Sequence, residues 1–201
     1  MRAFVFIPWV LLLSACFGGT VARVTPTAHD LSSDQPQVAP GTALILRQIE
    51  VYAPSWLDSP AMYYRLSYAD RTQRGTYATS RWAAPPAQLL ELKLGQRLLG
   101  HPATTQLQSA GCRLRVDLDE FIQDFARPQS SQVVLEVRGT LLAMPADNLL
   151  ARQRFRVVQA AGADARSGVV GLEAAARQLG DEIESWLMQS GNDVLELCRP
   201  R

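Results

Sequence analysis

The sequence is poor in the residues from which catalytic and metal sites are usually built. Among its 201 residues there are two histidines and three cysteines, too few for a site with several imidazole or thiolate ligands. The phosphate-binding loop, the dinucleotide-binding glycine pattern and the HExxH, CxxC and GxSxG motifs are all missing. His29 and His101 fall in segments that we expect to be solvated loops. We therefore predict neither an enzyme nor a metal or cofactor site.

An excess of charge of one sign is also lacking. The chain has 20 lysines and arginines against 19 aspartates and glutamates, so its formal net charge is +1. Such a balance creates no overall field that would attract nucleic acid. Hydrophobic residues make up 47% of the chain, which is enough for one sizeable core and too little for a second full domain. We expect one folded domain and no nucleic-acid partner.

The N-terminal block reads as a secretion signal. Arg2 is followed by an apolar run from Ala3 to Leu13, whereas a membrane-spanning helix needs about 20 apolar residues. A short apolar run after a basic start is typical of a secretory signal peptide. We therefore expect the mature protein outside the cytoplasm.

The end of this block is more specific. The sequence Leu13-Ser14-Ala15-Cys16 resembles the bacterial lipobox. That resemblance implies cleavage after residue 15, attachment of fatty acyl chains such as palmitate to Cys16, and a stable lipid anchor. Phe17 follows the cysteine in place of the aspartate that retains such proteins in the inner membrane, so we expect sorting to the outer membrane. The alternative is an ordinary signal peptide in which the cysteine falls there by chance.

Two cysteines remain once Cys16 carries lipid. Cys112 and Cys198 would lie in an oxidising compartment, where disulfides persist, and we predict that they form one disulfide. The alternative is two buried free thiols. A catalytic thiol is disfavoured because neither histidine has the sequence context of a base.

The pattern along the chain predicts an α+β fold with a mostly antiparallel sheet and two main helices packed on it. Residues 1–15 form the signal peptide, 16–41 a flexible tether rich in Gly, Ser and Pro, and 42–201 the domain. Periodicity gives the approximate order βββα-βββα. The expected strands are 43–51, 62–68, 76–79, 112–121, 133–142 and 152–157, and the expected helices are 85–99 and 172–187.

Charged side chains recur on the polar faces of the later strands. Asp117, Asp119 and Glu120 could be a carboxylate cluster for acid/base chemistry, and the stretch containing Arg152, Arg154 and Arg156 could bind lipid phosphates. We favour a simpler interpretation, in which these acids and arginines neutralise one another across strands. Asp119-Glu120 also breaks the alternation, which predicts a β-bulge.

Two segments combine bulky apolar residues with loop signals. Trp56 and Leu57 lie in a proline-bounded loop, and Trp82 lies just before the first helix. Exposed Trp and Leu side chains often anchor a partner, so all three are candidate partner-binding residues. For Trp56 and Leu57 a core role is equally compatible with the pattern, and for Trp82 we favour packing at the start of the helix.

The same segments carry a family resemblance. Trp56-Leu57-Asp58-Ser59-Pro60 leads into a strand with Tyr64-Arg65, and Arg81-Trp82-Ala83 precedes a leucine-rich helix. With Phe155 to Val157, Leu172 to Ala176 and Trp186-Leu187, this order resembles the ABC-type transport auxiliary lipoproteins of MCE-linked systems (PqiC/YmbA-like) over about Thr42 to Leu187. Where members often carry an aromatic Y-x-L stretch, this chain has His29-Asp30-Leu31, which argues against a strand before Thr42.

The resemblance implies a non-catalytic component on the periplasmic face of the outer membrane. It implies service to a system in which MCE-domain proteins and an inner-membrane ABC complex move lipid, with phospholipid as the expected cargo, and so support membrane integrity. The expected partners are an MCE-domain protein and the membrane, and the resemblance leaves open whether members assemble as homo-oligomeric rings. The alternative function is a periplasmic lipid-binding carrier that holds acyl chains in its own interior.

Overall fold

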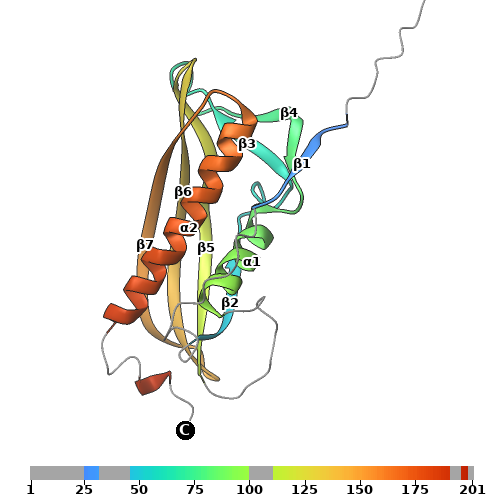
Figure 1. Cartoon of the computed structure of the whole chain (residues 1–201). Coiled ribbons are helices and arrows are strands. Elements are labelled where there is room, and N and C mark those ends of the chain that lie inside the picture. The colour runs from blue at the N-terminus through green and yellow to red at the C-terminus, as the bar shows by residue number, and fades with distance from the viewer. Residues whose placement is uncertain (1–24, 32–45, 100–110, 191–195, 199–201) are drawn as a thin grey trace, which may run out of the picture.

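The computed structural model describes residues 25–31, 46–99, 111–190 and 196–198. The predicted signal peptide, Cys16 and His101 therefore lie outside the described residues. The described residues form seven strands and two long helices, whose arrangement is drawn in Figure 1. Their bounds are β1 Thr27–His29, β2 Leu46–Tyr52, β3 Ala61–Arg65, β4 Arg74–Trp82, α1 Pro86–Leu98, β5 Gly111–Arg127, β6 Ser130–Met144, β7 Asn148–Ala161 and α2 Ala165–Gln189.

The strands form one seven-stranded sheet, which confirms the predicted α+β class. Its order is β1-β4-β3-β5-β6-β7, and β2 also pairs with β5. The long pairings of β5 with β6 and of β6 with β7 are antiparallel. Three shorter pairings are parallel, namely β1 with β4, β2 with β5 and β3 with β5. Because β5 is 17 residues long, one of its edges receives β2 near its start and β3 near its end.

The expected order βββα-βββα matches from β2 onward, and the strand before it was missed. The expectation of no strand before Thr42 is wrong, because Thr27–His29 forms β1 and pairs in parallel with the end of β4. The carbonyl of His29 accepts a hydrogen bond from the N–H of Ala83 at 2.7 Å, and Leu31 is buried. Part of the range assigned to the tether, 16–41, thus belongs to the fold, and 32–41 lies outside the described residues.

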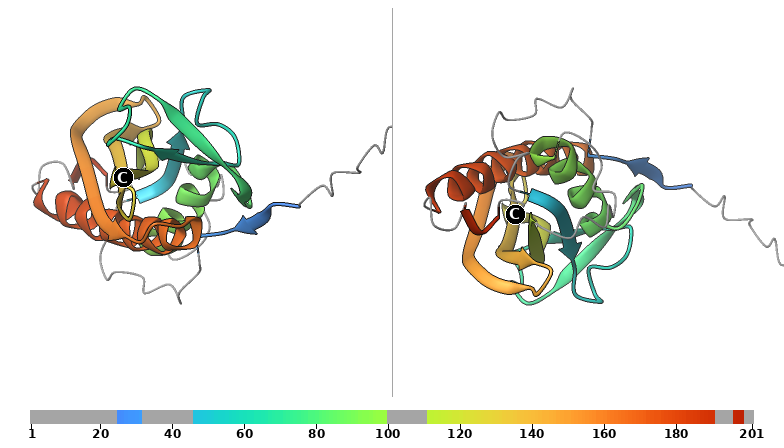
Figure 2. Two further views of the ribbon diagram at one scale, coloured as in Figure 1. Left: turned by 90° about the horizontal axis from the view of Figure 1, so that it is seen from above. Right: turned by 90° about the horizontal axis from the view of Figure 1, so that it is seen from below.

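Both helices lie on the same side of the curved sheet (Figure 2). Pro86 occupies the first turn of α1, where its missing N–H costs nothing. Asp164 caps α2 by accepting a hydrogen bond from the backbone N–H of Ser167 at 2.8 Å. This bond holds the pKa of the Asp164 carboxyl below its usual value. The predicted starts and ends of α1 are accurate to about one residue, whereas α2 begins well before residue 172.

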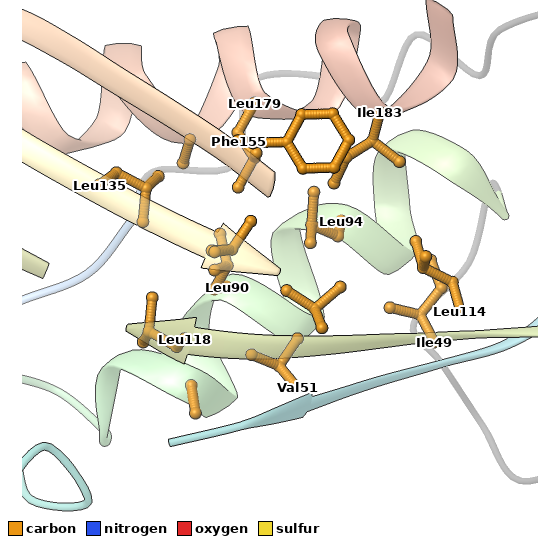
Figure 3. Packing of buried hydrophobic residues seen from close by; sticks show 14 of the residues in the cluster. Ile49, Val51, Leu90, Leu94, Leu114, Leu118, Leu135, Phe155, Leu179 and Ile183 are labelled. Atoms are coloured by element: carbon orange, nitrogen blue, oxygen red, sulfur yellow. The ribbon is translucent and has the colours of Figure 1, made fainter. Parts of the chain in front are cut away.

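The core fills the space between the helices and the sheet. Figure 3 shows Leu90 and Leu94 of α1 and Leu179 and Ile183 of α2 pointing towards one another and towards side chains of the strands. All four are buried, as the leucine-rich face of α1 and the apolar stripe of α2 predict. The carrier alternative requires interior space for an acyl chain, but in this region side chains occupy the interior.

The C-terminal end of the chain is joined to the start of β5 by a disulfide. Cys112 and Cys198 are bonded, with their Cα atoms 5.0 Å apart and a separation of 86 positions in sequence. Both side chains are fully buried. The bond therefore attaches the segment 196–198 to the strand that pairs with both β2 and β6.

Candidate partner-binding site

The loop between β2 and β3 turns two adjacent apolar side chains in opposite directions. The N–H groups of Leu57 and Asp58 both donate to the carbonyl of Pro54, at 2.8 and 3.1 Å. This turn places Leu57 in the core with no exposed surface, whereas Trp56 remains 40% exposed. An exposed tryptophan on a loop fixed by hydrogen bonds is the kind of residue that anchors a partner.

Three contacts hold Trp56 in place. The guanidinium of Arg74 lies 4.2 Å from the centre of its ring, in the geometry of a cation–π interaction. The Tyr63 ring meets it edge-on with centroids 6.3 Å apart, and the Tyr63 hydroxyl donates to the Trp56 carbonyl at 2.8 Å. We refer to Trp56, Tyr63 and Arg74 as the Trp56 cluster. A partner that covers this cluster would meet a side chain that has already lost most of its rotamer freedom.

The Trp56 cluster is tied to the sheet through Glu120. Arg74 pairs with both carboxylate oxygens of Glu120, and Arg65 donates to the same carboxylate at 2.9 Å. Glu120 follows the bulge that the sequence predicted, because the β5–β6 register shifts between Leu118 and Glu120. One carboxylate, 12% exposed, thus receives two guanidinium groups. The charges of these three side chains sum to +1.

Leu57 and Trp82 are corrections to the predicted partner-binding set. Leu57 is fully buried, and Trp82 is 1% exposed and packs edge-on against Phe121 with centroids 5.3 Å apart. The backbone N–H of Trp82 also donates to the carbonyl of Pro60. Since neither side chain reaches the surface, Trp56 alone of the three predicted residues is placed to touch a partner.

The acidic residues of β5 pair with arginines, as the simpler interpretation predicted. Asp119 pairs with Arg138 of β6 at 2.8 Å, and this hydrogen bond raises the pKa of the Arg138 guanidinium. Asp117 pairs with Arg115 of its own strand rather than across strands. These carboxylates are engaged by cations, which is the opposite of the environment that a general acid requires.

The arginines of β7 follow that interpretation less closely. Arg156 pairs with Glu136 at 2.7 Å. Arg152 donates to the hydroxyl of Thr140 at 3.3 Å rather than to a carboxylate. Arg154 lies opposite Arg138 in the β6–β7 register. Among the described residues, only one of these three arginines thus pairs with a carboxylate, whereas the sequence interpretation expected all of them to be neutralised.

A buried polar network around Gln123, three residues beyond Glu120 on β5, was missed at the level of sequence. The amide of Gln123 donates to the Ser131 hydroxyl at 2.8 Å and to the Gly162 carbonyl at 2.9 Å, and its oxygen accepts from Tyr77. Burial raises the pKa of the Tyr77 hydroxyl to about 12. A side chain on Gly168 would stand 2.1 Å from the Gln123 amide oxygen. The network joins β4, β5, β6 and the start of α2, so we assign it a structural role.

Two absences among the described residues bear on function. No cluster of three or more His, Cys, Asp or Glu side chains suited to a metal ion occurs among them. Within the same residues, no helix has the length and apolar character needed to span a bilayer. The described part of the chain thus offers an exposed, positioned aromatic cluster and charged strand faces.

Comparisons with known proteins give a family-model match and two similar crystal structures. A family model described as "ABC-type transport auxiliary lipoprotein component" matches residues 29–184. Comparison with curated protein sequences finds no match. The crystal structure of a DUF330 protein from Xanthomonas campestris is similar with a TM-score of 0.63 and 20% identity, over 84% of this chain and 96% of that one. A second crystal structure, of an uncharacterized protein, has a TM-score of 0.59 and 18% identity, over 81% of this chain and 99% of that one. At these identities the two structures show the shared fold.

Proposed function

The chain belongs to the family of ABC-type transport auxiliary lipoprotein components, and from that premise we propose that it is the outer-membrane-anchored, non-catalytic component of an MCE-linked lipid transport system. Cys16 would carry the lipid anchor on the periplasmic side, and the cargo moved by the system would be phospholipid. The observation that carries the proposal is the family match over 29–184. The lipobox-like sequence that precedes it supports the anchor.

The Trp56 cluster is the surface that we assign to the MCE-domain partner. It combines an exposed aromatic side chain with a fixed cation and lies at the junction of the β2–β3 loop with β3 and β4. Binding energy at interfaces is concentrated in a few such aromatic and arginine residues. An auxiliary protein that works by docking needs a rigid contact surface of this kind and does not need a catalytic set.

Replacing Trp56 with alanine should abolish capture of the MCE-domain protein. The substitution removes the exposed ring that the partner would cover, and a central interface tryptophan is worth about 2 kcal/mol or more, or roughly a thirtyfold loss of affinity. The measurement is co-purification of the tagged, full-length chain from detergent-solubilised envelopes, with mass spectrometry of the captured proteins. Wild-type protein should retain an MCE-domain protein, and the Trp56→Ala variant should not.

Tyr52→Ala is the matched control. Tyr52 is also an exposed aromatic residue under an arginine, with the Arg115 guanidinium 4.7 Å from its ring centre, but it lies at the end of β2 and outside the Trp56 cluster. It should leave capture unchanged. Capture of no MCE-domain protein by the wild type would refute the proposed partner. Equal losses in both variants would refute the assignment of the surface.

Replacing Cys16 with alanine should release the protein from the outer membrane. Without the thiol there is no site for the diacyl group, and the two-chain requirement for stable anchoring is not met. Metabolic labelling with a clickable palmitate analogue should mark the wild type and not the variant. In sucrose-gradient fractionation the wild type should follow the outer membrane. Labelling that persists in Cys16→Ala, or wild-type protein in the inner-membrane fraction, would contradict the proposed anchor or its location.

A further inference from the structure

The free edge of β7 is the long unprotected edge of the sheet. Within the described part of the chain, β7 pairs with β6 and with no other strand over its 14 residues. In an edge strand, every second residue directs its N–H and C=O groups away from the strand with which the edge strand is paired. These groups can accept another strand, and Figure 1 shows β7 at the outer border of the sheet with α2 passing beside it.

Two other outer positions of the described sheet are partly covered. The end of β4 is paired with β1. The outer side of β2 faces α1, where the N–H of Val51 donates to the carboxylate of Glu91 at 2.9 Å. A helix side chain thus satisfies a backbone donor that would otherwise be open on that edge. Before Ser80, β4 pairs only with β3 among the described residues, but β7 offers the longer free edge, over 14 residues.

One face of β7 presents a row of positive charge. Arg152, Arg154 and Arg156 are all exposed and alternate along the strand. Glu136 neutralises Arg156, but Arg152 contacts a hydroxyl group. No carboxylate partner is found for Arg154 among the described residues, and the arginine opposite it is already bound by Asp119. Acidic side chains on an added strand would face this row at every second position.

The same edge is hollowed where it meets α2. Two grooves lie between β7 and α2, of about 480 Å³ and about 430 Å³. The larger includes Phe155 and Trp186, whose rings meet edge-on with centroids 5.6 Å apart, and its rim carries charged side chains of both signs. These are Arg154 and Arg156 of β7 and Asp181 and Glu182 of α2. The smaller is bordered by Val170 and Gly171 of α2. The alternate side chains of an added strand that do not face the arginines would point towards these grooves.

We propose that the free edge of β7 binds an extended segment of a partner protein by strand addition, with acidic residues at every second position of that segment and apolar residues between them. The backbone of β7 supplies the pairing, the arginine row selects the acidic residues, and the Phe155–Trp186 pair and Val170 offer apolar contacts within the grooves. This surface is separate from the Trp56 cluster, and the proposal stands whether or not the partner belongs to an MCE-linked system.

A designed peptide tests the proposal on the full-length chain in neutral detergent. The probe is a fluorescein-labelled peptide of about ten residues in which glutamate and valine alternate, long enough to pair along most of β7. Fluorescence anisotropy should show saturable binding, and hydrogen exchange should show new protection of β7 amides. Arg154→Glu combined with Arg156→Glu should weaken binding at least about tenfold. Arg71→Glu, an exposed position in the β3–β4 turn, should leave it unchanged.

A second peptide separates strand addition from charge attraction. N-methylation at alternate positions removes backbone donors and keeps every side chain, so it should abolish binding. Equal binding of the methylated peptide, no effect of the β7 substitutions, or protection elsewhere in the chain would each overturn the proposal. A dimer that light scattering detects and that the β7 substitutions dissociate would also overturn the proposal, because a second copy would then occupy the edge. So would binding of phosphatidylglycerol vesicles that the β7 substitutions abolish, if the peptide itself does not bind.

Discussion

Replacing Trp82 with alanine should lower the free energy of unfolding by about 3–5 kcal/mol. The side chain is 1% exposed and packs edge-on against Phe121 of β5. It lies where β4 ends, beside β1 and just ahead of α1. Removing the indole leaves a large cavity at a point where three elements meet, and such sites collapse poorly. Urea unfolding of the full-length chain in neutral detergent, followed by near-ultraviolet circular dichroism, measures the change.

Trp56→Ala is the matched control for this experiment. It removes the same side chain from a position that is 40% exposed, where the lost ring contacts and the cation–π pair are together worth about 1 kcal/mol. We expect Trp56→Ala to impair partner capture with little loss of stability, and Trp82→Ala to impair stability first. Similar stability losses in the two variants would contradict the assignment of Trp56 to the surface and Trp82 to the core.

The contrast between these two tryptophans shows where sequence reasoning reached its limit. Trp56 and Leu57 are adjacent and both apolar, so composition alone could not decide which of them faces outward. The decision is made by the turn, in which two N–H groups converge on the carbonyl of Pro54. Arg74, which fixes Trp56, lies 18 positions further along and comes into reach through the β3–β4 pairing. No local pattern encodes that contact.

The parts of the fold that were predicted well are those with strong local periodicity. The alternation along β5 gave its buried side correctly up to the bulge at Asp119, and the leucine spacing gave α1. The start of α2 was missed because Gly168 and Gly171 look unfavourable for a helix. Their small size has a tertiary cause, since a side chain on Gly171 would stand 3.1 Å from Val133 of β6. At these positions close packing against the sheet outweighs the low helix propensity of glycine.

Strand β1 was missed for a related reason. Three residues give almost no periodic signal, and Thr27–His29 is stabilised by pairing with a strand more than 50 positions away. The same limit applies to the charged strands. The alternation showed which arginines share a face, but the register decides that Arg156 meets Glu136 and that Arg154 lies opposite another arginine. The excess positive charge on β7 could therefore be recognised only from the structure.

Removing the disulfide should have the other large effect on stability. Replacing Cys112 and Cys198 with alanine opens a closed loop of 86 residues, which on the chain-entropy model lowers the free energy of unfolding by about 4–5 kcal/mol. The unfolded chain becomes less compact without the bond, so the denaturant dependence of unfolding should also steepen. Urea titrations of the full-length wild type and the double variant in neutral detergent measure both quantities.

Measuring the stability of reduced wild-type protein distinguishes the effect of the covalent bond from the effect of packing the two sulfur atoms. Both cysteines are fully buried, so alanine also leaves small cavities, whereas dithiothreitol breaks the bond and keeps the atoms. If chain entropy dominates, reduced wild type should lose nearly as much stability as the double variant, and the double variant should not respond to the reductant. A loss below about 1 kcal/mol on reduction would instead assign most of the effect to packing. A large loss would make stable folding depend on an oxidising compartment, which is the setting that the proposed periplasmic location supplies.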